Sequence, residues 1–472
     1  MSFMVYDLIG LAIFCIAVTA FLITHKKKLK TESKIFLLYR TRAGIKTINW
    51  FSKKFSKLID FLEPVSITYG FIAMVFSLYL LIQSMTILLF STSIITKVPP
   101  LMPLIPYMPQ MFNLPLPPFY FTYWLIVIAI IAVVHEFGHG IYAARHNIKI
   151  KSTGFGFLGP FLAAFVEPDE ETMKRKTKRK QMAVVSAGSF SNILFAIIFL
   201  LILQLFFMGF YERDGVTGYI YSIEKLNISQ IDKIGPYNFS EFMSLNNSEM
   251  LNFVDDENVL VFTKDSHRYL LNKDLLVQVN SIKSNSTEIM VLFNDSPAIR
   301  ANLSGAIRKI DGKKVEKIED IEEILRNYQT GEQIIIETTN KEYNITLAEN
   351  SINKTRGYIG IQFMQLSPTQ NFFGSLSSPY FYPYANVTEK ISGSKDILIF
   401  FRDLFFWLII ILISVSLINM LPLAFLDGGR FIYLAFFALT KSKKIAERIY
   451  SLFSFIVILI FLLLMVIWLF KL

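Results

Sequence analysis

Two histidines and a glutamate form the most informative spacing in the chain. His135, Glu136 and His139 occur as His-Glu-Phe-Gly-His near the end of an apolar run that begins at Phe119. Residues four apart on a helix share one face, about 6 Å apart, so both imidazoles can face one zinc ion. The adjacent glutamate can then take a proton from water on that ion, which is the chemistry of amide hydrolysis. The spacing predicts a catalytic zinc site with Glu136 as the general base.

A catalytic zinc ion usually takes three protein ligands, so a third must lie elsewhere in the chain. The remaining histidines are His25 and His146, in basic loops, and His267, in a polar region, and each is expected to be solvent-exposed. The one cysteine, Cys15, lies inside an apolar run and offers no cysteine-based metal site or disulfide framework. The third ligand is therefore expected to be a carboxylate.

Asp427 is the carboxylate that best suits this role. It follows Pro422, which interrupts an apolar helix, and it precedes two glycines that allow the backbone to turn sharply. At about 1.5 Å per residue along each helix, Asp427 and the two histidines reach the same third of the bilayer, on the cytoplasmic side. The alternative is an aspartate at a helix end that pairs with Arg430.

The composition indicates a membrane protein. Hydrophobic residues make up 53% of the 472 residues, and the mean hydropathy is +0.46. A helix needs about 20 apolar residues to cross a bilayer. Six runs reach that length and predict a polytopic α-helical fold with about six transmembrane helices: Val5–Thr24, Thr68–Phe90, Phe119–Ala144, Met182–Phe207, Leu404–Phe425 and Tyr450–Phe470.

Charge patterning predicts the topology. Segments 26–57, 145–180 and 441–448 are basic, whereas the proline-rich segment 99–118 contains no Lys or Arg. Because short basic loops mark the cytoplasmic side, the spans are expected to alternate from an outside N-terminus. The net charge of +10 is then explained by contact with lipid headgroups, and no nucleic-acid partner is expected.

A large polar insert is expected to lie outside the cytoplasm. Composition alone would give about three Asn-x-Ser/Thr triplets in it. All nine triplets of the chain occur there, at Asn227, Asn238, Asn246, Asn285, Asn294, Asn302, Asn344, Asn353 and Asn386.

Part of the insert resembles a protease-associated PDZ domain. The resemblance rests on residues 296–303 and 307–315, although Gly305-Ala306 replaces the frequent Gly-Asp pair. The alternative is an ordinary α+β spacer domain. The patterning predicts four strands and one helix: Glu288–Phe293, Ile307–Ile310, Gln333–Glu337, Glu342–Ala348 and, helical, Ile318–Asn327.

Three separated motifs together resemble site-2 proteases, a family of intramembrane zinc metalloproteases. They are the metal-binding helix at 135–139, the small-residue segment 187–192, and the Asn-x-x-Pro and Leu-Asp-Gly motif at 419–429; a glycine-rich hairpin over 154–168 is also similar. Ser189 and Ala424 depart from the prolines that many relatives carry.

The resemblance implies roles for particular residues. Zinc would be held by His135, His139 and Asp427, with Glu136 as base, while Asn419 and Asn192 would bind the substrate backbone or stabilise the oxyanion. Alternatively, Asn192 serves only close helix packing. Asn419 could instead satisfy carbonyls that the proline break leaves free.

The expected organisation has five parts. They are 1–117 with two transmembrane helices, 118–210 with the first part of the protease core, 211–395 with the PDZ-like domain, 396–440 with the third core helix, and 441–472 with the last transmembrane helix.

The predicted activity is hydrolysis of peptide bonds within the transmembrane segments of single-span membrane proteins, that is, regulated intramembrane proteolysis. Two alternatives stay open: a membrane zinc protease of another family that acts on prenylated or misfolded proteins, and a non-catalytic PDZ scaffold. The sequence does not reveal the substrate, the triggering signal or the oligomeric state.

Overall fold

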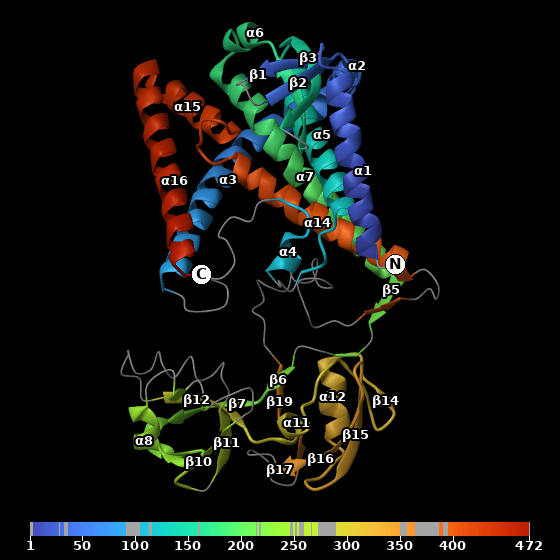
Figure 1. Cartoon of the computed structure of the whole chain (residues 1–472), viewed down its shortest axis with the longest axis vertical. Helices are drawn as coiled ribbons and strands as arrows, with labels where there is room; N and C mark the ends of the chain where they lie inside the picture. Colours follow the sequence, from blue (N-terminus) through green and yellow to red (C-terminus); the bar gives the residue numbers. More distant parts are fainter. Residues whose placement is uncertain are drawn as a thin grey trace. The chain divides into compact units, whose positions relative to one another are not determined.

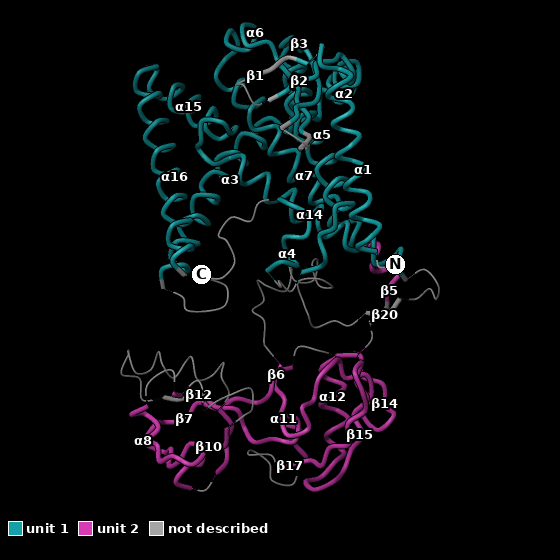
Figure 2. Tube along the Cα trace, in the orientation of Figure 1, with its two compact units in different colours: residues 1–203, 394–472 teal, residues 204–393 magenta. Residues whose placement is uncertain are grey.

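A computed structural model describes most of the chain. The described residues are 3–27, 29–32, 36–90, 104–112, 116–158, 161–213, 215–216, 219–245, 249–250, 253, 259–265, 267–271, 289–349, 356–363, 387–389 and 395–471. The chain divides into two compact units, one formed by residues 1–203 with 394–472 and the other by residues 204–393 (Figure 2).

Six helices among the described residues are long and apolar enough to cross a membrane, which confirms the predicted number of spans. Many large apolar side chains on them are exposed, for example Ile16 at 69% and Val75 at 67%, as expected for surfaces that face hydrocarbon. The chain is therefore an integral membrane protein. The helices are α1 (Phe3–Thr24), α3 (Ser56–Phe90), α5 (Phe121–Arg145), α7 (Lys178–Phe210), α14 (Lys395–Asn419) and α16 (Lys443–Lys471).

A four-stranded antiparallel sheet lies at one end of these helices, and its β4 packs against α5 (Figure 1). Its strands, in spatial order, are β1 (Leu29–Glu32), β2 (Phe36–Thr41), β3 (Ile150–Leu158) and β4 (Phe161–Pro168). The β3–β4 pair is the predicted hairpin. Gly154 is needed within it, because a Cβ there would lie 2.1 Å from the carbonyl oxygen of Tyr39 on β2.

The basic segment 26–57 is more structured than a loop, contrary to the sequence-based expectation. It contributes β1, β2 and the helix α2 (Ile45–Lys54), whose Ile48 is fully buried. Because the segment is rich in lysine, it was expected to be a solvent-exposed loop. The amphipathic pattern of α2 and the pairing of β2 with β3 instead anchor it to the helical unit.

The fifth span ends earlier than predicted. α14 stops at Asn419, three residues before Pro422, and residues 420–426 form turns that lead into a separate helix, α15 (Asp427–Thr440). Proline lacks an N–H and clashes with the preceding helical turn, so the apolar run cannot stay helical to Phe425. Short helices α4 (Met108–Met111) and α6 (Glu170–Lys174) complete the described helices of this unit.

The buried Asp7 on α1 caps the N-terminus of α5. Its carboxylate accepts hydrogen bonds from the backbone N–H groups of Phe121 at 2.7 Å and Thr122 at 2.9 Å, and from the hydroxyls of Thr122 and Tyr107 at 2.5 and 2.6 Å. The first N–H groups of a helix lack partners within the helix. A carboxylate from α1 supplies them, so α1 fixes the start of the helix that carries the histidines.

The unit formed by residues 204–393 holds two hydrophobic cores, where the sequence predicts one α+β domain over 211–395. The first lobe contains β8 (Ile231–Ile234), β9 (Tyr237–Asn238), α8 (Phe239–Ser244), β10 (Val259–Thr263) and β11 (Arg268–Leu271), with β7 (Ile223–Asn227) and β12 (Ile289–Asn294) extending its sheet. The second contains β13 (Ile307–Ile310), β14 (Lys313–Lys314), α12 (Ile318–Leu325), β15 (Gln333–Thr338) and β16 (Glu342–Thr346).

The two lobes repeat one pattern of strand, tight turn, strand, helix and hairpin. Ile234 pairs with Tyr237 in the first, and Ile310 pairs with Lys313 in the second, 76 positions later in each case (310 − 234 and 313 − 237). The first lobe lacks the Asp-Gly turn that makes the second recognisable. Smaller elements are β5 (Tyr211–Arg213), β6 (Tyr219–Tyr221), the 3-10 turn Ile228–Gln230, α11 (Pro297–Arg300), β17 (Ala348–Glu349), β18 (Gly357–Tyr358), β19 (Ile361–Phe363) and β20 (Val387–Glu389).

The strands and the helix predicted for the second lobe and for β12 agree with the structure to within one or two residues at most ends, and residues 342–348 divide into β16 and β17. Residue 288, predicted to start β12, lies outside the described residues. Four of the Asn-x-Ser/Thr triplets, at Asn246, Asn285, Asn353 and Asn386, also lie outside them.

Candidate metal centre

Helix α5 carries His135 and His139 on one face, as the four-residue spacing requires. Their ring centroids lie 4.7 Å apart, and their Nε2 atoms are 3.1 Å apart. The two side chains are 12% and 13% exposed. Two imidazole nitrogens thus point at one spot that is largely shielded from solvent.

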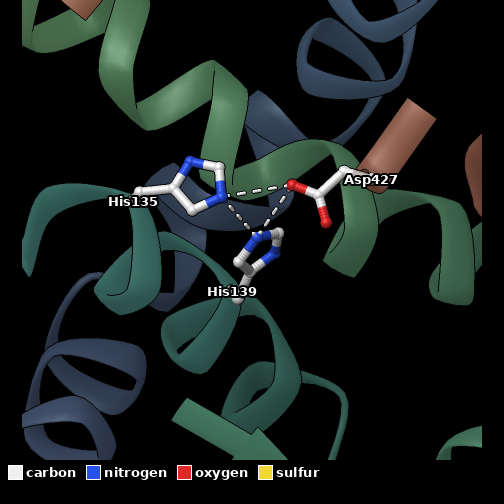
Figure 3. A group of neighbouring side chains, drawn as sticks. All are labelled: His135, His139 and Asp427. Atoms are coloured by element: carbon white, nitrogen blue, oxygen red, sulfur yellow. Dashed lines mark hydrogen bonds and ion pairs between the residues drawn. The ribbon is translucent and has the colours of Figure 1, made fainter. Parts of the chain in front are cut away.

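The break between α14 and α15 brings Asp427 to the same spot. Its Oδ2 lies 3.2 Å from Nε2 of His135 and 3.1 Å from Nε2 of His139, and Figure 3 shows the three atoms converging. The following glycines make this turn possible: a Cβ on Gly428 would lie 2.2 Å from the carbonyl oxygen of Met420.

The alternative pairing of Asp427 with Arg430 is not observed among the described residues. Arg430 instead places its Nη1 3.1 Å from Oε1 of Glu170 on α6. The aspartate is therefore directed to the histidines and the arginine to another helix.

The geometry of the three atoms suits a small tetrahedral cation. Ligand atoms at the zinc distance of about 2.0–2.1 Å are separated by roughly 3.3 Å in a tetrahedron, and the three separations here are 3.1, 3.1 and 3.2 Å. The Oδ2 atom of Asp427 is buried and has no hydrogen-bond donor among the described residues. A cation would satisfy it. The donor set of two imidazoles and one carboxylate is one that catalytic zinc uses.

Residues of helix α7 contact both imidazoles at Nδ1, on the side of each ring away from the Nε2 atoms. Nδ1 of His139 lies 2.7 Å from the carbonyl oxygen of Val184, and Nδ1 of His135 lies 3.2 Å from the side-chain amide of Asn192. A carbonyl acceptor holds the proton on Nδ1 and leaves Nε2 free to bind a metal, as in many zinc sites. For His135 the facing atom is Nδ2 of Asn192, while Oδ1 of Asn192 is buried without a hydrogen-bond partner among the described residues. Exchanging the two amide atoms would let Oδ1 accept the Nδ1 proton of His135 in the same way.

Gly188 on α7 leaves room for the cluster. A Cβ at this position would lie 2.3 Å from Nε2 of His139 and 2.8 Å from Cε1 of His135. The bare backbone of α7 therefore forms one wall of the centre, and any side chain there would occupy the space in which the imidazoles meet.

Glu136 is held by the edge of the sheet. Its Oε2 accepts a hydrogen bond of 2.7 Å from the backbone N–H of Val166 on β4. The sequence predicts both the glutamate and the hairpin, but it does not predict this contact. A contact between a helix and a strand edge leaves no signature in residue spacing.

The other residues considered from the sequence differ in their burial and in whether they contact the cluster. Asn192 is fully buried beside His135, whereas Asn419 is the last residue of α14 and forms no described hydrogen bond to the cluster. His267 is exposed as predicted, and His25 is half-buried. The predicted exposure of His146 is wrong.

His146 is only 7% exposed, and its Nε2 lies 3.4 Å from Oε2 of Glu63. His146 lies directly after α5, where the end of the helix packs on α3. The basic composition of its segment therefore led to a wrong expectation of solvent exposure.

Comparison with known proteins agrees with this centre. The profile of peptidase family M50 matches residues 123–464, a range that includes nearly all of α5 and the whole of α7, α14 and α15. The chain belongs to peptidase family M50. This is the site-2 protease family of membrane zinc metalloproteases, as the motifs predict.

One curated relative of this M50 protein is an uncharacterized protein of Methanocaldococcus jannaschii. The two are 33% identical over 173 residues, which cover 35% of this chain and 42% of the relative. The match therefore covers less than half of that protein.

Proposed function

We propose that this M50 protein is an intramembrane zinc endopeptidase that hydrolyses peptide bonds within the transmembrane segments of single-span membrane proteins. The observation that carries the proposal is the convergence of His135, His139 and Asp427, within 3.2 Å of one another, beside Glu136 on a membrane-spanning helix. Ionisable groups in such a helix are costly to bury and are retained mainly where they perform a function.

His135, His139 and Asp427 would hold the zinc ion. When bound, zinc acts as a Lewis acid that polarises the scissile carbonyl and makes water acidic enough to lose a proton near neutral pH. Glu136 accepts that proton during attack on the amide carbon and then donates it to the leaving nitrogen. The hydrogen bond from Val166 keeps the carboxylate of Glu136 aimed at the reacting atoms.

Strand β4 is proposed to hold the substrate in an extended form. A peptide bond inside a transmembrane helix is shielded by its own hydrogen bonds, so the segment must unwind before hydrolysis. Among the described residues β4 pairs only with β3, and its other edge borders the base at Val166. An unwound segment added to this edge would place an amide next to Glu136.

Cleavage is proposed to occur in the cytoplasmic third of the bilayer. His135 and His139 follow Phe121, the start of α5, by about 21 and 27 Å at 1.5 Å per residue, and α5 ends at Arg145 beside the basic segment 145–180. We propose that the insert lies on the opposite, extracytoplasmic side. Its two lobes would there act as a filter for the outer parts of substrates, with the second lobe as the PDZ-like element.

The experiment incubates detergent-purified protein with a model single-span substrate, with and without chelator, beside the Glu136→Gln variant. The proposal requires fragments that the chelator and the variant both abolish, cut within the apolar segment as shown by mass spectrometry. Fragments cut only outside that segment would instead support a membrane protease that trims exposed regions. Absence of fragments from the wild type under every condition would support the non-catalytic scaffold, and chelator-sensitive fragments from Glu136→Gln would exclude Glu136 as the base.

A further inference from the structure

A cavity distinct from the metal centre lies at the N-terminal ends of α1, α5 and α14. It has a volume of about 410 Å³, within the range of about 300–1,000 Å³ that is usual for small-molecule sites. All its lining residues belong to the unit of residues 1–203 and 394–472, and they come from the start of α1, from the start of α5 with the segment before it, and from the start of α14.

One wall of the cavity is a continuous row of aromatic rings. The rings of Phe3 and Tyr120 lie 4.9 Å apart, those of Tyr120 and Tyr123 6.1 Å, and those of Tyr123 and Phe400 5.1 Å, between centroids. Aromatic faces carry a negative quadrupole and attract organic cations. The row therefore favours a positively charged group of some size over an anion.

Charged side chains also line the cavity, and Asp396 and Asp403 lie on the same face of α14 as Phe400. Asp396 and Asp403 contribute two carboxylates, while Arg402 contributes one guanidinium, whose Nε lies 3.0 Å from Oδ1 of Asp403. The side chain of Asp403 is only 4% exposed. Of the charged side chains that line the cavity, two are therefore carboxylates and one is a guanidinium.

The location of the cavity identifies the source of the cation. Phe3, Tyr123 and Asp396 lie in the first turns of α1, α5 and α14, three helices that could each cross the bilayer. Alternate spans begin on the same side, so these ends share one headgroup layer. Beside the cavity on α14, the exposed Ile397 and Phe401 offer apolar surface on which acyl chains can lie.

We propose that the cavity binds the ammonium headgroup of a membrane lipid. The ammonium would lie against the rings of Tyr120 and Tyr123 and pair with Asp396, while the acyl chains follow the outer face of α14. A bare divalent metal ion is a poorer occupant, because hard cations need several oxygen ligands and most of this wall is aromatic carbon.

The test titrates the purified full-length protein with phosphatidylethanolamine and phosphatidylglycerol of identical acyl chains and counts bound lipids by native mass spectrometry. The ethanolamine lipid should bind at least about fivefold more tightly than the glycerol lipid. Asp396→Asn should remove most of this preference, and Tyr123→Leu should weaken ethanolamine binding about fivefold, whereas Tyr123→Phe should not. Ile413→Ala, an exposed position on the same helix about 15 Å beyond Asp403, is the matched control, because it lies away from both the cavity and the surface proposed for the acyl chains.

Several results would overturn the proposal. Equal binding of the two lipids by the wild type, or an unchanged preference in Asp396→Asn, would exclude a headgroup site. Equally tight displacement by soluble phosphoethanolamine would identify a free ammonium compound in place of a lipid. Displacement by a peptide with a lysine-rich flank, with no lipid preference, would identify a substrate contact. Retained zinc content in each variant verifies that the fold is intact.

Discussion

Gly188 on α7 faces the imidazole of His139 so closely that a Cβ would come within 2.3 Å of Nε2. The metal centre therefore depends on an absent side chain as much as on the ligands. This contact explains why a glycine lies within the small-residue segment 187–192.

Gly188→Ala is expected to abolish zinc binding and activity while leaving the protein folded in the membrane. The added methyl group displaces the imidazole rather than the helix backbone, because alanine is favourable in helices. Zinc content measured by elemental analysis should fall to background. Gly209→Ala on the same helix is the control, since a Cβ there meets nothing within 4 Å. Normal zinc content in Gly188→Ala would contradict the packing.

Asp427→Asn is expected to lower zinc affinity by at least tenfold, because a neutral amide replaces the anionic ligand while the shape is kept. Arg430→Gln should leave zinc binding unchanged, since Arg430 pairs with Glu170. Competition with a zinc-sensitive dye measures both. Equal losses in the two variants would show that the aspartate acts through the arginine and not as a ligand.

Val166→Pro is expected to lower the turnover rate by about 10- to 100-fold with zinc content retained. Proline removes the N–H that holds Glu136, and an edge strand tolerates it better than a central strand. The loss should be smaller than that from removing the base, about 10²- to 10⁴-fold. Val166→Ala keeps the backbone donor and should stay active. Similar losses in both variants would assign the effect to side-chain packing.

Asp7→Ala is expected to destabilise the helical unit by about 2–4 kcal/mol, because Tyr107 and the start of α5 lose buried charge-assisted hydrogen bonds. The midpoint of thermal unfolding in detergent reports the loss. Ile13→Ala on α1 is the control, because Ile13 is 61% exposed. An unchanged midpoint for Asp7→Ala would mean that other donors or water replace the cap.

The first lobe and the turn that follows β12 are expected to become less stable in acid, because the carboxylate of Asp295 is then protonated. Burial acts to raise the pKa of Asp295, but hydrogen bonds from Arg300 and Arg268 outweigh it and hold the pKa below its usual value. A carboxyl with a lowered folded-state pKa contributes stability above its unfolded pKa of about 3.9 and loses it as pH falls further. Hydrogen exchange over residues 289–303, compared at pH 5 and below pH 4, measures the change.

The control for this acid effect is Asp295→Asn, which should show little difference in protection between the two pH values once intrinsic exchange rates are corrected. An equal loss of protection in the wild type and in the variant would assign the acid sensitivity to other carboxyl groups.

The sequence predicts the clustering of His135, His139 and Asp427 because their positions depend on local spacing and on a proline break, both of which are visible in the sequence. It does not predict the hydrogen bond from the N–H of Val166 to Glu136, nor the capping of the N-terminus of α5 by Asp7. Each of these interactions joins elements that are distant in sequence. The donor is a backbone N–H group, which is nearly the same for every residue type and so leaves no mark in the sequence. The strands in segment 26–57 escaped prediction because both are short and neither shows a regular apolar–polar alternation.

The separate core of the first lobe was not predicted, for a different reason. Its β8–β9 turn contains Gly235-Pro236, whereas the equivalent turn of the second lobe is Asp311-Gly312. The first lobe therefore lacks the residues on which the predicted resemblance of the second lobe rests, although the strand pairing is the same in both.

The separation of the ligands between α5 and α15 has a consequence for biogenesis. On the proposed assignment, a ribosome-bound chain that has inserted α5 and α7 still lacks Asp427, which is made only after the whole insert and α14. Such a chain cannot assemble the complete centre. The protease would therefore stay inert throughout most of its own synthesis and become competent only when its last helices dock.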